Sequence, residues 1–443
     1  MKNTACLREF AKYTSLNITG MLSLSCYILV DTFFVSVGLG ANGLAALNFA
    51  IPVYGFIIGI SLMLGIGGAT KYAILKSQND THKANQAFTI TVYFMLAAAF
   101  VFFAAGFFFP AAVTRLFGTD EAVFEMTKTY LQVILLFSPM MILQHVMSCF
   151  VRNDGAPQLA MIAMVSGSLS NIVLDYVFII LLEMGMFGAA LATGLASIIS
   201  VLILSSLYLR KKNCFHLTKC AVSRRFIAEI FGTGLPSLVT ELSVGVVMIV
   251  FNRIILQLEG YIGVAAYGVI ANIAIIILAI YTGIAQGIQP IISSNYGSGN
   301  TANVRAILRY ALILLAAVSA VVYMCVFLGT SQIVSIFNSE QNIALQSVAT
   351  QGMKLYFIAC IFAGFNIIMS FYFTSTECTR PAQKISILRG FLLIIPMVFL
   401  LSALGGITGV WLAFPATEFI TSITGLALYI FYPRRRKLLN RLP

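Results

Sequence analysis

Twelve long apolar runs follow one another along almost the whole chain, and they constrain its fold more than any other feature. A helix needs about 20 apolar residues to cross the hydrocarbon core of a bilayer, and every run reaches that length. Only 9% of the residues are charged and the mean hydropathy is +0.95, which excludes a water-soluble globular protein. The sequence therefore predicts an all-α membrane protein with transmembrane helices at 13–37, 45–70, 86–110, 126–150, 157–182, 186–209, 232–257, 262–290, 305–329, 348–375, 383–404 and 408–432.

Lys and Arg are distributed unevenly between the two sides that these helices would connect. Most of the 27 basic residues lie in the terminal segments and in every second loop, a set in which we include Arg152 and Arg389. Because basic residues in short loops stay in the cytoplasm, we expect both termini on the cytoplasmic side. The formal net charge of +12 then follows from topology, and we expect no nucleic-acid partner. The opposite loops and helix ends hold only Arg115, Lys128, Arg253 and Lys354.

The chain contains an internal repeat. Gly188–Ala192 resembles Gly409–Ala413, and Phe117–Glu121 resembles Phe337–Gln341. Both pairs are offset by roughly 220 residues, a period that no single match would establish. Each half holds an even number of spans, so the halves are parallel repeats, an arrangement found in transporters whose substrate site lies between repeats.

The repeat and the charge pattern together predict the domain organisation. We expect two pseudo-symmetric six-helix lobes, at 1–209 and 232–432. A charged cytoplasmic loop, 210–231, would join them, and a basic cytoplasmic tail, 433–443, would bind the anionic surface of the lipid bilayer.

Four carboxylates lie inside predicted spans, where each costs at least about 2.5 kcal/mol and is a functional candidate. Asp31 and Asp175 lie at the same depth, roughly 10 Å below the outer ends of their helices at 1.5 Å per residue. Tyr27 shares the helix face of Asp31, one turn away. The other two acids are Glu241 and Glu418.

Two further oxygen-bearing side chains reach the depth of these acids. Asn171 lies one turn from Asp175, and Thr193 lies opposite on the next helix. Asp31, Asn171, Asp175 and Thr193 would offer oxygen ligands to a hard cation such as Na⁺, and two buried carboxylates could instead hold a proton. The alternative is that Asn171 and Asp175 only hydrogen-bond two helices together. At the equivalent positions of the second lobe the chain has Ile395 and Phe399, so we expect the ion site in the first lobe.

Four polar residues are weaker candidates for a substrate cavity: Glu241, Gln286, Gln289 and His145. Each has an alternative interpretation as a hydrogen-bonding or satisfied core residue that packs helices together. Gly283-x-x-x-Gly287 and Gly55-x-x-x-Gly59 indicate closely packed helix faces.

Several classes of function are excluded by what the sequence lacks. There is no G-x-x-x-x-G-K-[ST] motif to bind ATP, and the eight cysteines form no metal-ligand spacing. An intramembrane enzyme would need paired catalytic residues on facing helices, and the chain has only three His. We expect no enzymatic activity and no cofactor, with energy drawn from an ion gradient.

The motifs resemble one family over the whole chain. They are the run Val30–Gly40, Gly234–Pro236 at the start of the seventh helix, Gln289-Pro290 leading to Asn295–Gly297, and Asn171-x-x-x-Asp175 with Thr193 on the next helix. They are similar to the multidrug and toxic compound extrusion (MATE) transporters, of the larger group that includes lipid-linked oligosaccharide flippases. The match to the prokaryotic DinF-like branch implies a cation-coupling role for Asp31, Asn171, Asp175 and Thr193, with Tyr27 nearby. The chain departs from the NorM-like branch, whose helix-seven Glu lies about one turn deeper than Glu241.

The resemblance also implies an activity and a location. It predicts a monomeric secondary active transporter in the bacterial inner membrane that exports small hydrophobic cationic drugs in exchange for Na⁺ or H⁺ by alternating access. The alternative is a flippase for a lipid-linked sugar of the same superfamily. Such a flippase needs a cation-rich cavity, whereas the basic residues here are predicted to lie mostly in cytoplasmic loops.

Overall fold

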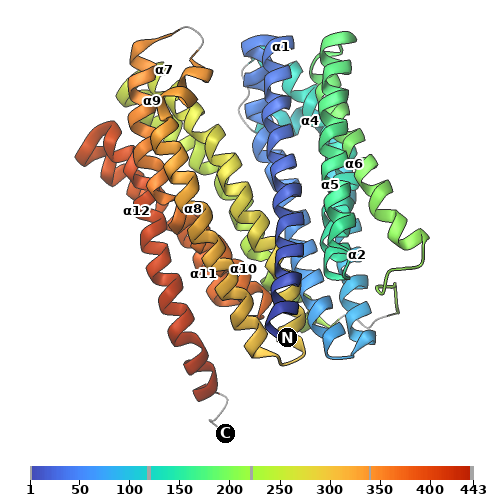
Figure 1. Ribbon diagram of the computed structural model, residues 1–443. Coiled ribbons are helices and arrows are strands. Elements are labelled where there is room, and N and C mark those ends of the chain that lie inside the picture. The colour runs from blue at the N-terminus through green and yellow to red at the C-terminus, as the bar shows by residue number, and fades with distance from the viewer. Residues whose placement is uncertain (1, 117–120, 220–222, 339–340, 440–443) are drawn as a thin grey trace.

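The computed structural model describes residues 2–116, 121–219, 223–338 and 341–439, which form helices joined by short turns and one extended linker, without a strand in these ranges. The predicted all-α fold is confirmed. The first half of the chain, blue to green in Figure 1, lies beside the second half, yellow to red. The helix α1 begins and the helix α12 ends at the same end of the bundle, which we call the terminal end; the opposite end is the far end.

The first half of the chain contains these elements: α1 (Lys2–Ser77), α2 (Thr81–Phe108), α3 (Pro110–Leu116), α4 (Glu121–Asn153), α5 (Pro157–Asp175), the π-helical η1 (Tyr176–Leu181) and α6 (Gly185–Leu209). The second half contains α7 (Arg224–Gly297), α8 (Thr301–Phe337), α9 (Ile343–Tyr356), the 3₁₀ turn η2 (Phe357–Ala359), α10 (Cys360–Ser375), α11 (Thr379–Ile387), the π-helical η3 (Leu388–Leu392) and α12 (Ile394–Leu439). Within the described residues, nine helical segments are long and apolar enough to cross a membrane.

Three of these nine segments are pairs of helices that fold back at glycine. The backbone leaves helical geometry at Gly40 in α1, at Gly260 in α7, and at Gly405 and Gly406 in α12. Gly40, Gly260 and Gly406 have φ of 65°, 62° and 55°, which a glycine adopts without steric cost. The nine segments therefore make the twelve crossings predicted from sequence. The predicted connections at 38–44 and 258–261 are shorter than expected, because a single glycine makes each turn.

Side-chain contacts show that the chain reverses at these turns. The Tyr27 and Tyr54 hydroxyl groups, on either side of Gly40, lie 3.0 Å apart. The Phe251 and Tyr267 rings, on either side of Gly260, stack with centroids 5.4 Å apart. Each half of the molecule therefore begins with a tight helical hairpin, which agrees with the internal repeat.

Two hydrophobic cores lie side by side. One is built from buried residues between Val35 and Ile230, and the other mainly from residues between Phe251 and Ala413. The start of α1 crosses over, because Cys6 and Phe10 pack into the second core. Lobe boundaries at 209 and 232 remain a prediction. The repeat segments at 117–120 and 339–340, and the side chains of the tail 433–443, lie outside the described residues.

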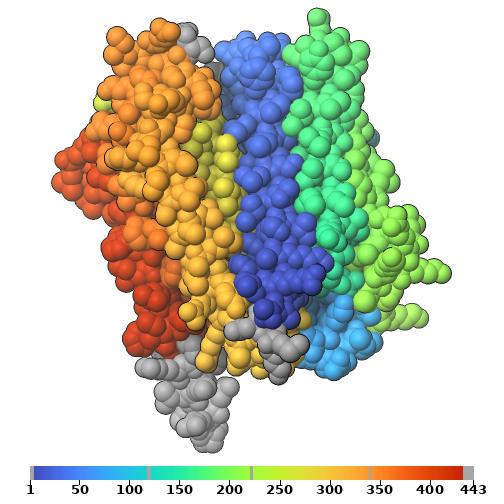
Figure 2. Space-filling model, viewed as in Figure 1, coloured from blue at the N-terminus to red at the C-terminus, as the bar shows by residue number. Residues whose placement is uncertain are grey.

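Glycines let the two halves meet closely near the terminal end. A Cβ placed on Gly287 would lie 2.8 Å from Thr14 Cα, and one on Gly283 would lie 2.7 Å from Ile18 Cα. The first segment of α1 therefore packs on the second segment of α7 almost backbone to backbone, as the glycine spacing predicted. Toward the far end, Figure 2 shows the surface hollowed between the blue segment and the orange one, with atoms of α7 recessed between them.

The linker that follows α6 is fastened to the first half. Phe215 is buried against Phe88 and Phe150, with ring centroids 4.7 and 5.9 Å away. The Cys214 and Thr218 backbone N–H groups donate to Asp154 Oδ2 at 2.8 Å and to Thr89 Oγ1 at 3.0 Å. Much of the predicted inter-lobe loop thus belongs structurally to the first half.

Candidate functional site

Four polar side chains from three helices meet inside the first half of the bundle. Asp31 lies on the first segment of α1, Asn171 and Asp175 on α5, and Thr193 on α6. Helical spacing places Asn171 and Asp175 on one face of α5. None of the four is more than 9% exposed. The structure therefore brings together the residues that the sequence placed at one depth.

Hydrogen bonds connect these side chains into one cluster. With its amide oriented to satisfy both ends, Asn171 donates to Asp175 Oδ2 at 2.9 Å and accepts from the Thr193 backbone N–H at 3.3 Å. The Asn171 amide also lies 3.4 Å from Thr193 Oγ1. The carboxyl groups of Asp31 and Asp175 are neighbours that interact with each other. Like charges at such short range repel strongly in a low-dielectric interior, which favours uptake of a proton or a cation.

The cluster has unused acceptor capacity. Asp31 Oδ1 and Asp175 Oδ1 are buried without a hydrogen-bond partner, which is costly for a polar atom away from water. The described residues contain no group of three or more His, Cys, Asp or Glu that could hold a metal ion. Two carboxylates, an amide and a hydroxyl are ligands for a hard ion such as Na⁺ rather than for a transition metal. The same two carboxylates could share a proton.

Tyrosines extend the cluster toward the second half. Tyr27, as predicted, lies near Asp31, and its hydroxyl meets that of Tyr54 at 3.0 Å. Tyr54 interacts electrostatically with both Asp31 and Glu241. On α4, Tyr130 lies beside Thr193 and interacts electrostatically with Asp31 and Asp175. Sequence reasoning missed Tyr54 and Tyr130. The position of Tyr54 could have been a signal, because it follows Gly40 by almost as many residues as Tyr27 precedes it.

Two of the weaker cavity candidates lie in a contact between the halves near the terminal end. Gln286 accepts a hydrogen bond from Arg152 Nη1 at 2.6 Å. Gln289 donates to Thr70 Oγ1 at 2.9 Å, and its Oε1 accepts from Asn153 Nδ2 at 3.0 Å. Gln289 is fully buried and Gln286 is 7% exposed. Both glutamines hold helices together in this structure.

The other two weaker candidates differ from the glutamines. Glu241 is half-buried on the first segment of α7 and packs against α1, where its Cβ lies 3.3 Å from a Cβ placed on Gly59. His145 is half-buried on α4 and makes no hydrogen bond to another described residue. Only Glu241 therefore lies near the acid cluster, through its shared neighbour Tyr54.

Two arginines that the charge pattern places in loops lie inside the helix bundle, Arg152 buried and Arg389 half-buried. Arg152 is 2% exposed near the end of α4, where its Nη1 donates to Asn17 Oδ1 at 2.9 Å as well as to Gln286. The Arg389 side chain is 12% exposed and forms an ion pair with Glu418 at 2.8 Å. These two assignments to loops were wrong. Arg152 belongs to the last turn of α4, Arg389 lies on η3 between α11 and α12, and each side chain turns inward to a polar partner.

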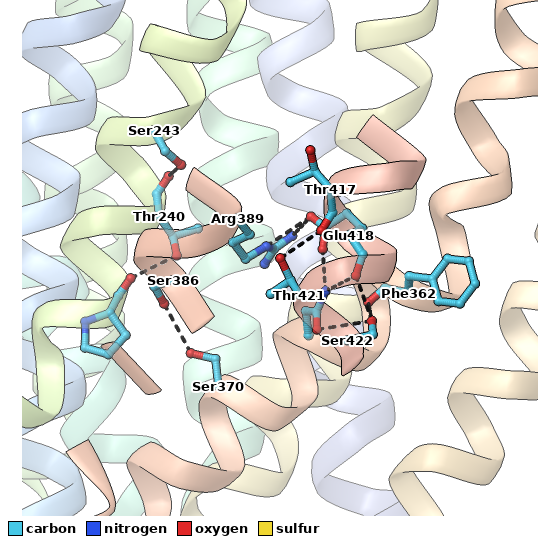
Figure 3. A network of polar contacts seen from close by, with 12 residues as sticks. Thr240, Ser243, Phe362, Ser370, Ser386, Arg389, Thr417, Glu418, Thr421 and Ser422 are labelled. Atoms are coloured by element: carbon cyan, nitrogen blue, oxygen red, sulfur yellow. Dashed lines mark hydrogen bonds and ion pairs between the residues drawn. The ribbon is translucent and has the colours of Figure 1, made fainter. Parts of the chain in front are cut away.

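The second half thus has its own charged network, shown in Figure 3. Arg389 on η3 and Glu418 on the second segment of α12 point toward each other, and Asn366 on α10 donates to Glu418 Oε2 at 2.7 Å. The π-helical turn η3 brings Gly390 so near α7 that an added Cβ would lie 2.8 Å from Ser243 Cβ. The sequence analysis noted Glu418 but assigned it no partner.

Comparison with known proteins identifies the family. The model of the MatE family matches two segments of the chain, residues 18–177 and 236–400. The chain belongs to the MatE family. The two matched segments of this MatE protein fall in the two halves of the repeat, and they include Asp31, Asn171 and Asp175.

Relatives and solved structures agree with this assignment. The chain is 26% identical over 95% of its length to the "Multidrug export protein MepA" of Staphylococcus saprophyticus, of which it covers 92%. It is 24% identical to the protein of that name from Staphylococcus aureus strain MRSA252, over 94% of this chain and 92% of that one. A crystal structure described as MATE in complex with MaL6 has a TM-score of 0.90 at 22% identity, covering 98% of this chain and 97% of that one. An outward-facing multidrug resistance MATE transporter has a TM-score of 0.89 at 22% identity, covering 100% and 99%. These structures establish the shared fold.

Proposed function

We propose that this MatE protein is a secondary active multidrug exporter that expels hydrophobic cationic compounds in exchange for inward Na⁺ or H⁺. The observation that carries the proposal is the buried acid pair of Asp31 and Asp175, each with an unpaired oxygen, inside a bundle of membrane-spanning helices. Family membership and relatives described as multidrug export proteins support the same activity.

The proposed mechanism uses alternating access between the two halves. A Na⁺ ion or proton that reaches Asp31 and Asp175 cancels their charge, allows the first segment of α1 to repack, and weakens the hold on a cationic substrate. One inward charge at about 150 mV supplies roughly 3.5 kcal/mol, which corresponds to an accumulation ratio on the order of a few hundredfold. The coupling cluster comprises Asp31, Asn171, Asp175, Thr193 and Tyr27, with Glu241 as a candidate on the substrate side.

Orientation and assembly are part of the proposal. We place the protein in the bacterial inner membrane as a monomer, with the terminal end in the cytoplasm, because most basic residues lie in the terminal segments and alternate loops. In that orientation the halves are in contact on the cytoplasmic side, which corresponds to an outward-facing state. The orientation is tested with two variants, each carrying a single cysteine in place of Gln78 or Glu183, which are treated in intact cells with a thiol reagent that does not cross the membrane. Glu183 should react and Gln78 should not.

The coupling role is tested by Asp31→Asn, which keeps the shape and removes the charge. In proteoliposomes, gradient-driven export should fall at least about tenfold while the variant still inserts and folds. Glu183→Gln, an exposed acid in the turn between η1 and α6, is the matched control and should transport like the wild type. Wild-type transport by a well-folded Asp31→Asn protein would remove Asp31 from the mechanism.

Substrate charge separates drug export from lipid-linked sugar transport. An acidic site of low dielectric repels anions and attracts lipophilic cations. Cells that express the protein should therefore resist ethidium or tetraphenylphosphonium more than neutral or anionic compounds of similar size. Equal resistance to all three charge classes, or a preference for anions, would reject the cation preference and favour the flippase.

A further inference from the structure

The carboxylate of Glu418 in the second half has a donor at each oxygen and a cation beside it, unlike the acid pair in the first half. Glu418 Oε1 accepts from Arg389 Nε at 3.1 Å and from Nη2 at 2.8 Å, while Oε2 accepts from Asn366 Nδ2 at 2.7 Å. Ser422 Oγ lies 3.2 Å from Asn366 Oδ1 and holds the amide in this orientation (Figure 3). Glu418 is 1% exposed. Each oxygen of the Glu418 carboxylate therefore accepts at least one hydrogen bond, and Oε1 accepts two from a cation, whereas Asp31 and Asp175 each have one buried oxygen without a partner.

The internal repeat relates the two sites. Matching Gly188–Ala192 to Gly409–Ala413 places Glu418 at the position of Ser197, one turn from Thr193. Arg389 lies on the helix that corresponds to α5, which carries Asn171 and Asp175 in the first half. In the first half, this pair of helices carries Asp175 without a cationic side chain beside it. In the second half, the corresponding pair carries Glu418 together with the guanidinium group of Arg389.

The other groups around Glu418 add no charge that would replace the guanidinium of Arg389. Among the described residues, Arg389 and Tyr356 are the titratable groups that interact with Glu418, from η3 and from α9. Asn366 on α10 is neutral. Removal of the guanidinium would leave one buried carboxylate with no counter-charge, which is a strongly unfavourable state.

We propose that Arg389 is a tethered counter-cation that permanently occupies the ion position of Glu418, so that the second half neither takes up nor releases a coupling ion. The proposal builds on the proposed function, because it explains why ion exchange is confined to the first half. It predicts that removing Arg389 converts Glu418 into a new site for a proton or Na⁺.

The test uses the purified full-length protein in an Asp31→Asn, Asp175→Asn background, which silences the first site. Arg389→Gln, Glu418→Gln, both together, and the conservative Arg389→Lys are added to it. The melting temperature is measured against pH, with and without Na⁺. With Arg389→Gln the folded protein must bind a proton or Na⁺ at Glu418 that the unfolded chain does not bind. Its melting temperature should therefore rise on acidification by about 2 °C per pH unit, or on addition of Na⁺.

The matched variants separate this outcome from simple loss of a structural contact. The background, Arg389→Lys and the Arg389→Gln, Glu418→Gln pair should all lack the added dependence on pH or Na⁺. If Arg389→Gln cannot be purified, its amount in membranes should be low and should recover when Glu418→Gln is added. A response of Arg389→Gln equal to that of the background, or no recovery in the pair, would overturn the proposal. The proposed function has its own test in the same data. It fails if pH and Na⁺ change the melting temperature of the wild type and of the Asp31→Asn, Asp175→Asn background by the same amount.

Discussion

Among the acids of the described residues, Asp31 and Asp175 are the two with a buried oxygen that lacks a hydrogen-bond partner. Asp175 also accepts a hydrogen bond from the uncharged Asn171 amide. Neutral donors reduce the cost of burying a charge and do not cancel it. At the scale of single residues, the ion or proton of the proposed mechanism would supply the partner that these two oxygens lack.

Thr193→Val tests which ion completes the cluster. A partly dehydrated Na⁺ needs the hydroxyl oxygen as a ligand, whereas a proton needs only a carboxylate. Loss of the Thr193 hydroxyl, as a ligand of Na⁺ or as a group that orients another ligand, should reduce Na⁺-driven export by about 10–100-fold. Proton-driven export should be nearly unchanged. Export is measured at fixed pH with and without a Na⁺ gradient.

Thr193→Ser retains the oxygen and serves as the control, so it should preserve transport with either ion. Wild-type export that does not depend on Na⁺ would discard the Na⁺ version of the site. A Thr193→Val protein with full Na⁺-driven export would remove Thr193 from the ligand set.

Most residues of the cluster could be predicted because helical periodicity fixes both the face and the depth of a side chain. Asp31, Asn171, Asp175 and Thr193 needed only a count from the ends of their helices. Tyr130 and Arg389 could not be found in this way, because their roles depend on which distant helix lies opposite. The positions of Gln286 and Gln289 depended on whether the two halves are in contact at their depth, which a sequence pattern does not determine.

At the scale of helices, glycine decides where two segments touch and where one segment turns. The glycine pair on α7 gives the backbone of α1 room to approach, and the isolated glycines at 40 and 260 turn the chain back on itself. The sequence analysis predicted the first use from the four-residue spacing. The predicted helix bounds left several residues between helices at 38–44 and 258–261, because an apolar run does not show which single glycine takes a positive φ.

Gly287→Ala and Gly268→Ala form a matched pair on the second segment of α7. At Gly287 the added Cβ would meet the backbone of Thr14 at 2.8 Å, and at Gly268 it would meet nothing within 4 Å. Gly287→Ala should therefore cost about 1–3 kcal/mol through overpacking. Gly268→Ala should be neutral or stabilise the helix by up to about 1 kcal/mol. Melting temperatures of the purified proteins measure both; equal effects would show that the contact with α1 is not a tight one.

At the scale of the whole molecule, polar contacts between the halves concentrate near the terminal end. Lys71 on α1 forms ion pairs with Glu229 on α7 at 2.8 Å and with Glu377, which follows α10, at 2.7 Å. Arg152 joins α4 to Gln286 on α7 a short distance away. Alternating access requires all of these contacts to break together, so they stabilise the state in which this end is closed.

Lys71→Gln should shift the population toward states in which the terminal end is open. The ion pairs are partly exposed, so their loss is worth about 1 kcal/mol in total, or about a fivefold change in the ratio of the two states. Spin labels at Gln78 and Ser298, in a background without native cysteines, should report a larger share of long distances. Lys83→Gln is the control, because Lys83 pairs with Asp80 in its own half. An unchanged distance distribution in Lys71→Gln would show that other contacts hold the end closed.

The fastened linker sets a length limit on the motion of the two halves. The last anchor in the described part of the linker is the Thr218 backbone N–H, and α7 begins at Arg224. The chain between them can extend to about 20 Å at most, at 3.3–3.6 Å per residue. However far the halves separate elsewhere, the start of α7 stays within that radius of Thr89 and its neighbours on α2. The length of the linker therefore bounds how far the start of α7 can move away from α2 while this anchor holds.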